Sequence, residues 1–393
     1  MAQHILVVNM GSSSGKLSMF ERVDSKSVNT VDKSVNKTPV WSTTVKFDNE
    51  SAENSVRAKL EEALQPLWAK DTLNFQKETI QFVGHRVVHG GGKYESGVLI
   101  DQTVKDDIHR FEEYAPLHNQ LNLFGIEAIE HIFGKQTKQV AVFDTTFHRT
   151  IPEVVARYPL PYDWYEKRGI RRYGFHGISN AYAAVRASEM LNVKPEDFTG
   201  IVCHLGSGCS VTAIQNGRSV DTSMGFTPLE GLMMGTRSGS IDPGIILNLL
   251  GKPKMTVDEL NHVLNHESGL VAVSGLPNDM RTIHEQAEKG NERAKLALEM
   301  FVYRIQSYIG AYFVHLKNAK ALVFTGGIGE HCPYIRNPVV TALDGIGCVL
   351  DSEHNECVDG DTDISHTSTR IRILVLTTGE DLFVAQETCR RAM

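Results

Sequence analysis

Three short segments rich in glycine and serine are the parts of this sequence best suited to chemistry. They cover residues 11–15, 206–210 and 326–329. Polyphosphate binding needs backbone N–H groups that point at the ligand with no side chain in the way, and Gly and Ser provide this. Lys16 follows the first segment directly and adds a cation. The three segments together predict a site for a nucleotide or another polyphosphate.

The first segment also resembles two other motifs. Gly11-x-x-x-Gly15-Lys16 is one residue shorter than a Walker A loop and has no Ser or Thr after the lysine. Gly11-x-Ser13-x-Gly15 fits the nucleophile elbow of a serine hydrolase, but that motif leads from a strand into a helix. Residues 17–21 alternate like a strand instead. A tight hairpin without a ligand stays open for any one segment taken alone.

Arginine, histidine and aspartate residues complete the candidate site. Arg86 and Arg237 stand beside glycine or other small residues, and a guanidinium group matches carboxylate and phosphate oxygens. His118 and His176 lie in the segments Pro-Leu-His-Asn and Gly-Phe-His-Gly, where a structural hydrogen bond is the alternative role. Asp144 closes a strand, and we expect it to orient Arg86 or a metal-bound water rather than to take a proton.

Apolar runs of strand length must position these residues. A strand, a Gly/Ser turn and a second strand follow one another twice, with the turns at Gly11 and Gly206, half the chain length apart. This repeat predicts a duplicated α/β domain around a central cleft; two unrelated hairpins are the alternative. Strands are expected at 4–10, 16–21, 40–47, 81–88, 139–143, 200–205, 210–215, 321–325 and 370–376, and helices at 52–69, 292–317 and 380–391. Residues 326–329 are expected to form a loop after their strand.

Composition limits the class of protein. The chain has 393 residues, of which 41% are hydrophobic and 22% charged, as in a soluble globular protein of two domains. A net charge of −7 argues against a nucleic-acid partner. No apolar run approaches the ~18 residues that cross a bilayer, and the first residues do not resemble a signal peptide. The six cysteines lack zinc spacing, and we expect free thiols in a cytoplasmic protein without a membrane partner.

Eight motifs resemble the acetate kinase family of short-chain fatty-acid kinases. The opening N-M-G-S-S-S-G-K at 9–16 is similar to that family's N-x-G-S-S-S-x-K, and D-T-S-M-G-F-T-P-L-E-G at 221–231 is similar to its second long motif. The remaining similar segments occur in the family's order. They are 84–90, 115–119, 143–145, 173–177, 234–239 and 324–330.

The resemblance implies a fold and an activity. The fold is α/β, with two duplicated actin-like ATPase (ribonuclease H-like) domains flanking a nucleotide cleft. The first domain would cover 1–148 plus 382–393, and the second 149–381 with the nucleotide site and a homodimer interface. The implied reaction is reversible, Mg²⁺-dependent transfer of the ATP γ-phosphoryl group to acetate, giving acetyl phosphate and ADP, with Mn²⁺ as another usable metal. A propionate kinase and a non-catalytic actin-like nucleotide-binding protein are the alternatives.

The resemblance also assigns roles to residues. The catalytic set is Arg86, His118, Asp144, His176 and Arg237. The acyl group would be held by Arg86, Val88, Leu117, Phe175 and Pro228. The nucleotide would be bound by Ser12, Lys16, His204, Gly206, Ser207, Gly208, Asp279, Arg281, Gly327 and Gly329. The metal side would be formed by Asn9 and Glu380.

Five positions depart from the family's pattern. Gly15 stands for Leu or Ile, Asn180 for His, His331 for Asn and Gly379 for Asn. Ser207 replaces an Asn in the second phosphate segment, and its shorter side chain reaches phosphates less well. The phosphoryl donor is therefore open between ATP, another nucleotide and pyrophosphate.

Overall fold

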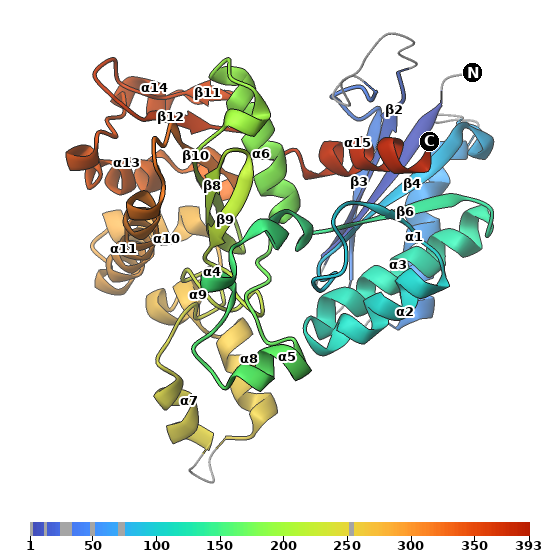
Figure 1. Ribbon diagram of the computed structural model, residues 1–393, viewed down its shortest axis with the longest axis horizontal. Coiled ribbons are helices and arrows are strands. Elements are labelled where there is room, and N and C mark those ends of the chain that lie inside the picture. The colour runs from blue at the N-terminus through green and yellow to red at the C-terminus, as the bar shows by residue number, and fades with distance from the viewer. Residues whose placement is uncertain (1–2, 12–13, 24–33, 48–51, 70–74, 251–254) are drawn as a thin grey trace. The chain divides into compact units, whose positions relative to one another are not determined.

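The computed structural model describes residues 3–11, 14–23, 34–47, 52–69, 75–250 and 255–393. Contacts divide the chain into two compact units, each built around a six-stranded sheet. The first unit comprises 1–149, 177–179 and 379–393. The second comprises 150–176 and 180–378 (Figure 1).

The sheet of the first unit begins with the predicted hairpin. Its strands follow the order β3-β2-β1-β4-β6-β5, with β1 antiparallel to β2 and parallel to β4, and with β4 parallel to β6. Met10 pairs with Gly15, and the turn is closed by Gly11 N, which donates to Ser14 O at 2.7 Å. The strands are β1 (His4–Met10), β2 (Ser14–Glu21), β3 (Trp41–Lys46), β4 (Ile80–Val87), β5 (Val98–Leu99) and β6 (Lys138–Phe143).

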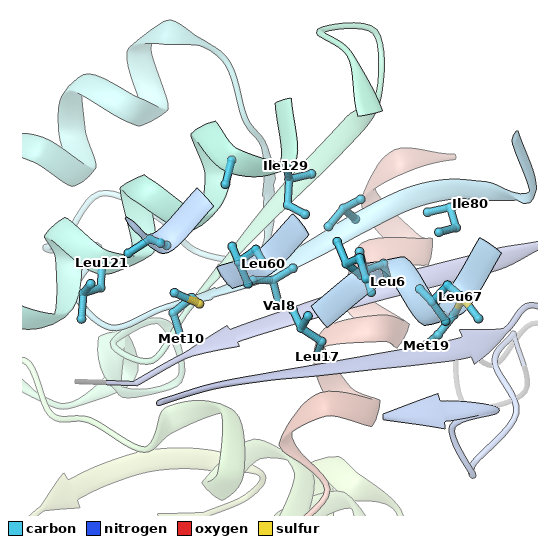
Figure 2. Packing of buried hydrophobic residues seen from close by; sticks show 14 of the residues in the cluster. Leu6, Val8, Met10, Leu17, Met19, Leu60, Leu67, Ile80, Leu121 and Ile129 are labelled. Carbon is cyan, nitrogen blue, oxygen red and sulfur yellow. The ribbon is translucent and has the colours of Figure 1, made fainter. Parts of the chain in front are cut away.

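Helices cover both faces of this sheet. They are α1 (Glu53–Trp68), α2 (Gln102–Arg110), α3 (Pro116–Phe133) and α15 (Glu380–Ala392). Apolar side chains of β1 and β2 pack against α1 and α3 in one buried cluster, which includes Leu6, Leu60 and Ile129 (Figure 2). On the other face α15 lies so close to β4 that a Cβ at Gly84 would collide with Val384 and Thr388. Because both faces are covered, residues 5–8 of β1 are fully buried and uniformly apolar.

The sheet of the second unit repeats this topology. Its order is β11-β12-β10-β7-β8-β9, which read from the β9 edge matches the first sheet strand for strand. The parallel and antiparallel pairs also correspond, since β7 is antiparallel to β8 and parallel to β10. The predicted duplication is therefore confirmed. The strands are β7 (Gly200–Leu205), β8 (Cys209–Gln215), β9 (Arg218–Thr222), β10 (Ala321–Thr325), β11 (Thr362–Asp363) and β12 (Arg372–Val375).

The second unit holds most of the helices. They are α4 (Glu153–Ala156), α5 (Tyr162–Arg168), α6 (Gly177–Met190, whose first three residues group with the first unit), α7 (Pro243–Leu250), α8 (Val257–His266), α9 (Gly269–Ser274), α10 (Met280–Glu288), α11 (Glu292–His315), α12 (Gly326–His331), α13 (Pro333–Thr341) and α14 (Ser352–Glu356). Throughout the described part of the chain, none of the helices has the length and apolar character needed to span a membrane.

One predicted loop is a helix. Residues 326–329 were expected to form a loop after β10, but they make the first turn of α12. Gly326 has φ 80°, and a Cβ there would lie 2.6 Å from Leu205 O. A glycine in this conformation turns the chain directly from strand to helix without connecting residues. The backbone N–H groups at this helix start remain suited to an anion.

Candidate active site

Four predicted residues of the first unit meet at the carboxyl ends of its parallel strands. Asn9 lies near the end of β1, Arg86 near the end of β4, Asp144 follows β6, and Glu380 begins α15. Arg86 donates to Asp144 Oδ2 from Nη2 at 2.7 Å and from Nε at 3.1 Å. Its Nη1 donates to Asn9 Oδ1 at 3.1 Å and lies 3.7 Å from Glu380 Oε2. The strand ends thus hold one guanidinium group among three polar partners, an arrangement that is frequent at ligand sites of α/β sheets.

The charge of Arg86 is secured by its neighbours. Burial opposes the charged form, but Asp144 and Glu380 raise the pKa of Arg86 above its usual value. Asp144 is almost completely buried, whereas the Arg86 side chain retains 17% of its exposure. Asp144 therefore fixes the guanidinium group on one side, and part of the group remains accessible to a ligand.

Asp381 was not predicted as a site residue, yet it ties the phosphate hairpin to α15. Its Oδ1 accepts from Asn9 Nδ2 at 2.9 Å, and its Oδ2 accepts from Ser18 Oγ at 2.8 Å. Lys16 Nζ lies 2.8 Å from the same Oδ2. Residues 379–381 group with the first unit through these contacts, although the sequence placed them in the second domain. The signal available in the sequence was an acid beside Glu380 at the start of a helix.

Two buried asparagines of α3 were also missed. Asn122 Oδ1 accepts from Val88 N, and its Nδ2 donates to Met10 O, both at 3.0 Å. Asn119 Oδ1 accepts from His89 N at 3.0 Å in the same manner. One helix therefore fixes the backbone that precedes the first phosphate segment and the backbone that follows Arg86. Two amides three residues apart in an apolar helix were the only available hint.

The remaining predicted residues of the first unit are placed as follows. Val88 follows β4 and is buried, and His118 is partly buried in the first turn of α3. Ser12 and the side chain of Leu117 lie outside the described residues.

In the second unit, two histidines stand beside the Gly206–Gly208 turn. His176 adopts left-handed backbone angles, φ 56° and ψ 24°, directly before α6. Its ring centroid lies 4.2 Å from that of His204, and its Nδ1 lies 3.0 Å from Ser210 Oγ. A Cβ at Gly208 would lie 3.3 Å from His176 Nε2 and 3.5 Å from Arg237 Nη1. The turn, His176 and Arg237 therefore converge on one point.

Arg237 is a partly buried cation with no acidic neighbour among the described residues. Its Nη1 donates to Pro228 O at 3.3 Å and lies 3.9 Å from Met234 Sδ. Burial lowers the pKa of Arg237, and among the described residues no carboxylate forms an ion pair with it. Burying a charge is costly unless a counter-charge is present. A negatively charged ligand beside Gly208 would supply that counter-charge.

Phe175 and Ser207 adjoin this point in the chain, whereas Asp279, Arg281, Gly327 and Gly329 lie on other elements. Phe175 is buried next to His176, and Ser207 accepts a hydrogen bond from Gly235 N at 3.4 Å through its backbone oxygen. Asp279 caps α10 by accepting from Thr282 N at 2.6 Å, and this bond lowers the pKa of Asp279. Arg281 lies exposed on α10, and Gly327 and Gly329 lie in α12.

The donors of the first unit suit a hard cation. Mg²⁺ takes oxygen ligands, and it is typically held by one or two carboxylates together with waters and substrate phosphates. Glu380 offers a carboxylate that is 12% exposed, and Asn9 offers an amide oxygen that already accepts from Arg86. Across the residues that the structure covers, no group of three or more His, Cys, Asp or Glu could hold an ion. Glu380 and Asn9 are therefore the residues of this unit that could hold such a cation.

Comparison with known proteins places the chain in a family. The acetokinase family model matches residues 4–386. An acetate kinase of Cyanothece sp. is 44% identical over 403 residues, covering 98% of this chain and 97% of the relative. The crystal structure of Porphyromonas gingivalis acetate kinase has 36% identity and a TM-score of 0.86, with full coverage of both chains. That of a Francisella tularensis propionate kinase has 36% identity and a TM-score of 0.85, covering 99% of this chain and 100% of the other. The near-complete match, the shared fold and the duplicated sheets together mean that the chain belongs to the acetokinase family.

Proposed function

We propose that this protein transfers the γ-phosphoryl group of ATP to the carboxylate of acetate, reversibly, giving acetyl phosphate and ADP. Membership of the acetokinase family supports the reaction class. The observation that carries the proposal is Arg237, a partly buried guanidinium group beside a glycine turn with no carboxylate partner among the described residues. Both substrates are anions and can neutralise it.

The reaction needs positive charge more than it needs a base. A carboxylic acid with a pKa near ~4 is already ionised at neutral pH, so no proton must be removed before attack. Phosphoryl transfer passes through a loose, in-line transition state whose charge spreads over the phosphoryl oxygens. Arg86 and Arg237 would bind the two anions, His176 would donate to the transferred group, and Asp144 would keep Arg86 in place.

A divalent cation completes the proposed site. Glu380 and Asn9 would hold Mg²⁺, or Mn²⁺, which when bound neutralises phosphate oxygens. Lys16 and the backbone N–H groups of the two hairpin turns would bind the nucleotide phosphates. Asp279, Arg281 and the start of α12 would lie on the adenosine side.

Propionate is the second candidate acceptor, because a propionate kinase structure resembles this chain about as closely as an acetate kinase structure does. The residues proposed to contact the acyl group are Val88 and Leu117 of the first unit and Phe175 and Pro228 of the second. One additional CH₂ group is worth only ~0.8 kcal/mol in an apolar pocket. We therefore expect kcat/KM for acetate and for propionate to differ by about tenfold or less.

A homodimer in the cytoplasm, where ATP is available, is the proposed state. The support for an interface is α7, whose residues include no buried side chain. Leu247 and Leu250, which lie three residues apart and therefore on one side of this helix, are 71% and 39% exposed. Adjoining apolar groups exposed in this way are typical of contact surfaces. Leu247→Glu should give monomers in light scattering if α7 forms the interface, whereas Val314→Glu, at an exposed site on α11, should not.

Trapping the product decides the reaction. The protein is incubated with ATP, Mg²⁺, hydroxylamine and one acid from the series formate, acetate, propionate and butyrate. Acetohydroxamate should form, and GTP and pyrophosphate tested as donors show whether Ser207 has changed the donor. A protein that gives no hydroxamate with any acid and donor is not an acyl-phosphate-forming kinase, and the non-catalytic alternative then holds.

A further inference from the structure

A partly buried polar cluster in the second unit contacts the segment that carries Pro228. The cluster consists of Tyr158, Arg172 and Glu230. Arg172 Nη2 donates to Glu230 Oε1 at 2.6 Å, and Tyr158 Oη donates to Glu230 Oε2. The side chains of Arg172 and Glu230 are 16% and 30% exposed. None of the three belongs to the proposed catalytic, substrate-binding or metal-binding residues.

Arg172 also holds main-chain carbonyls at the end of β9. Its Nη1 donates to Thr222 O at 3.0 Å, to Ser223 O at 3.3 Å and to Met224 O at 3.0 Å. One guanidinium group thus gathers three successive carbonyls. Burial opposes the charge of Arg172, but Glu230 raises its pKa, so the donor stays protonated.

Tyr158 fixes the next part of the same segment. Its hydroxyl oxygen accepts from Phe226 N at 2.8 Å while its proton is donated to Glu230. Burial raises the pKa of Tyr158, which keeps that proton in place. Between the two anchors, Gly225 has no space for a side chain, because a Cβ there would collide with Glu230 and with Tyr158 Oη.

The segment fixed in this way contacts Arg237 itself and the chain that leads to His176. Gly225 O accepts from Tyr173 N at 3.0 Å and from Gly174 N at 3.2 Å, and Gly174 lies two residues before His176. Pro228 O accepts from Arg237 Nη1 at 3.3 Å. The main chain between the anchors therefore determines where His176 and Arg237 stand relative to each other.

We propose that Arg172, Glu230 and Tyr158 are positioning residues for phosphoryl transfer, which lock residues 222–230 and thereby align Arg237 with His176. They touch no substrate themselves. The expected fall in kcat rests on the proposed function. The fixing of residues 222–230 by the three side chains does not depend on that function. A displacement of about 1 Å in a catalytic group can lower turnover by about 10²-fold.

Kinetics of three variants test the alignment. Glu230→Gln keeps the shape of the side chain, Tyr158→Phe removes one hydroxyl, and Arg172→Gln removes the guanidinium group. We expect kcat to fall about 10–100-fold while KM for ATP and for acetate changes less than about threefold, because the transition state loses more than the bound substrates do. Arg172→Lys should recover less than a tenth of the lost rate, since an ammonium group cannot reach three carbonyls and a carboxylate.

The matched control is Arg186→Gln. Arg186 donates to Asp361 at 2.7 Å with a side chain that is 22% exposed, so it forms a similar ion pair in the same unit. Rates are expressed per folded molecule, and the melting temperature is recorded for each variant. A cluster that only stabilises the fold would lower the melting temperature of Glu230→Gln and Arg186→Gln alike and leave kcat unchanged; that result overturns the proposal.

Hydrogen exchange tests the lock without any substrate. The amides of Gly174 and Phe226 should exchange at least about tenfold faster in Tyr158→Phe, because local opening governs exchange, while those of β7 and β8 keep their protection. Unchanged protection at both amides contradicts the proposal, even if Arg172→Gln fails to fold. A wild-type protein that forms no hydroxamate disproves the proposed function. The exchange result then still shows whether the cluster fixes residues 222–230.

Discussion

Arg86 and Arg237 are both partly buried, but their surroundings differ in a way that can be measured. Arg86 is neutralised by Asp144, whereas Arg237 has no acid beside it among the described residues. Removing one partner of a buried ion pair costs about 3–5 kcal/mol, because the other charge is left uncompensated. Removing a lone buried cation relieves an unfavourable charge instead.

We expect Arg86→Ala to lower the free energy of unfolding by about 3–5 kcal/mol, and Arg237→Ala to lower it by at least about 2 kcal/mol less. Both should reduce turnover by at least about 10²-fold, as loss of a transition-state donor does. Urea unfolding and the hydroxamate assay measure the two effects. Arg86→Ala combined with Asp144→Asn serves as the control and should recover stability but not activity. Equal destabilisation by the two single variants would show that Arg237 has a counter-charge.

At the scale of elements, α3 connects the two backbone segments on which the first unit's site depends. Asn122→Leu preserves apolar packing but leaves Val88 N and Met10 O without partners. Each unsatisfied buried group costs about 1–3 kcal/mol, so we expect the two to lower the free energy of unfolding by about 2–6 kcal/mol and to lower kcat. Gln120→Leu, at an exposed site on the same helix, is the control and should change stability by less than about 0.5 kcal/mol. Similar losses in both variants would contradict the bridging role of Asn122.

The elements that the sequence revealed are those with a local cause. The strand at 4–10 and the turn at Gly11 follow from apolar runs and turn residues, and the structure has both. Helix α3 was not expected, because Leu121 and Ile129 pack into one cluster while Ile126 packs into another, so that its apolar residues form no single stripe. The helical start at Gly326 depends on contact with Leu205, which a local pattern does not contain.

The residues of the candidate site also differ in how far the sequence reveals them. The motifs identified Arg86, His176 and Arg237, which lie near glycines, and Asp144, which follows an apolar strand; both patterns are visible in a sequence. Asn122, Arg172 and Tyr158 act through main-chain groups that are distant in the sequence. Their roles become visible only when folding brings those groups within hydrogen-bond distance.

At the scale of the whole molecule, two buried histidines make stability depend on pH. Burial lowers the pKa of His85 to about 4 and that of His89 to about 3. The unfolded chain takes up protons near pH 6.5, where the folded chain does not. Between pH 6.5 and 4 the unfolded state therefore binds more protons, and stability falls as the pH is lowered.

We expect His85 alone to contribute about 3 kcal/mol to this loss, since one pKa unit corresponds to about 1.4 kcal/mol. The loss is complete near pH 4 and absent above pH 7. Urea unfolding between pH 7.5 and 4.5 measures it. His85→Gln, which can still pair with Gln139, should reduce the slope of stability against pH, and the exposed His366→Gln should not. A slope that His85→Gln leaves unchanged would mean that protonation of His85 does not drive the loss.

The first unit draws its last helix from residues 380–392, whereas the second unit lies within 150–378. A ribosome adds residues in sequence, at about 5–20 per second. The sheet of the first unit is synthesised first, but one of its faces stays uncovered until α15 has been translated. The second unit, in contrast, is complete in sequence by residue 378. The amino-terminal half of this enzyme is then the last to be completed, and chaperones would be needed most during that interval.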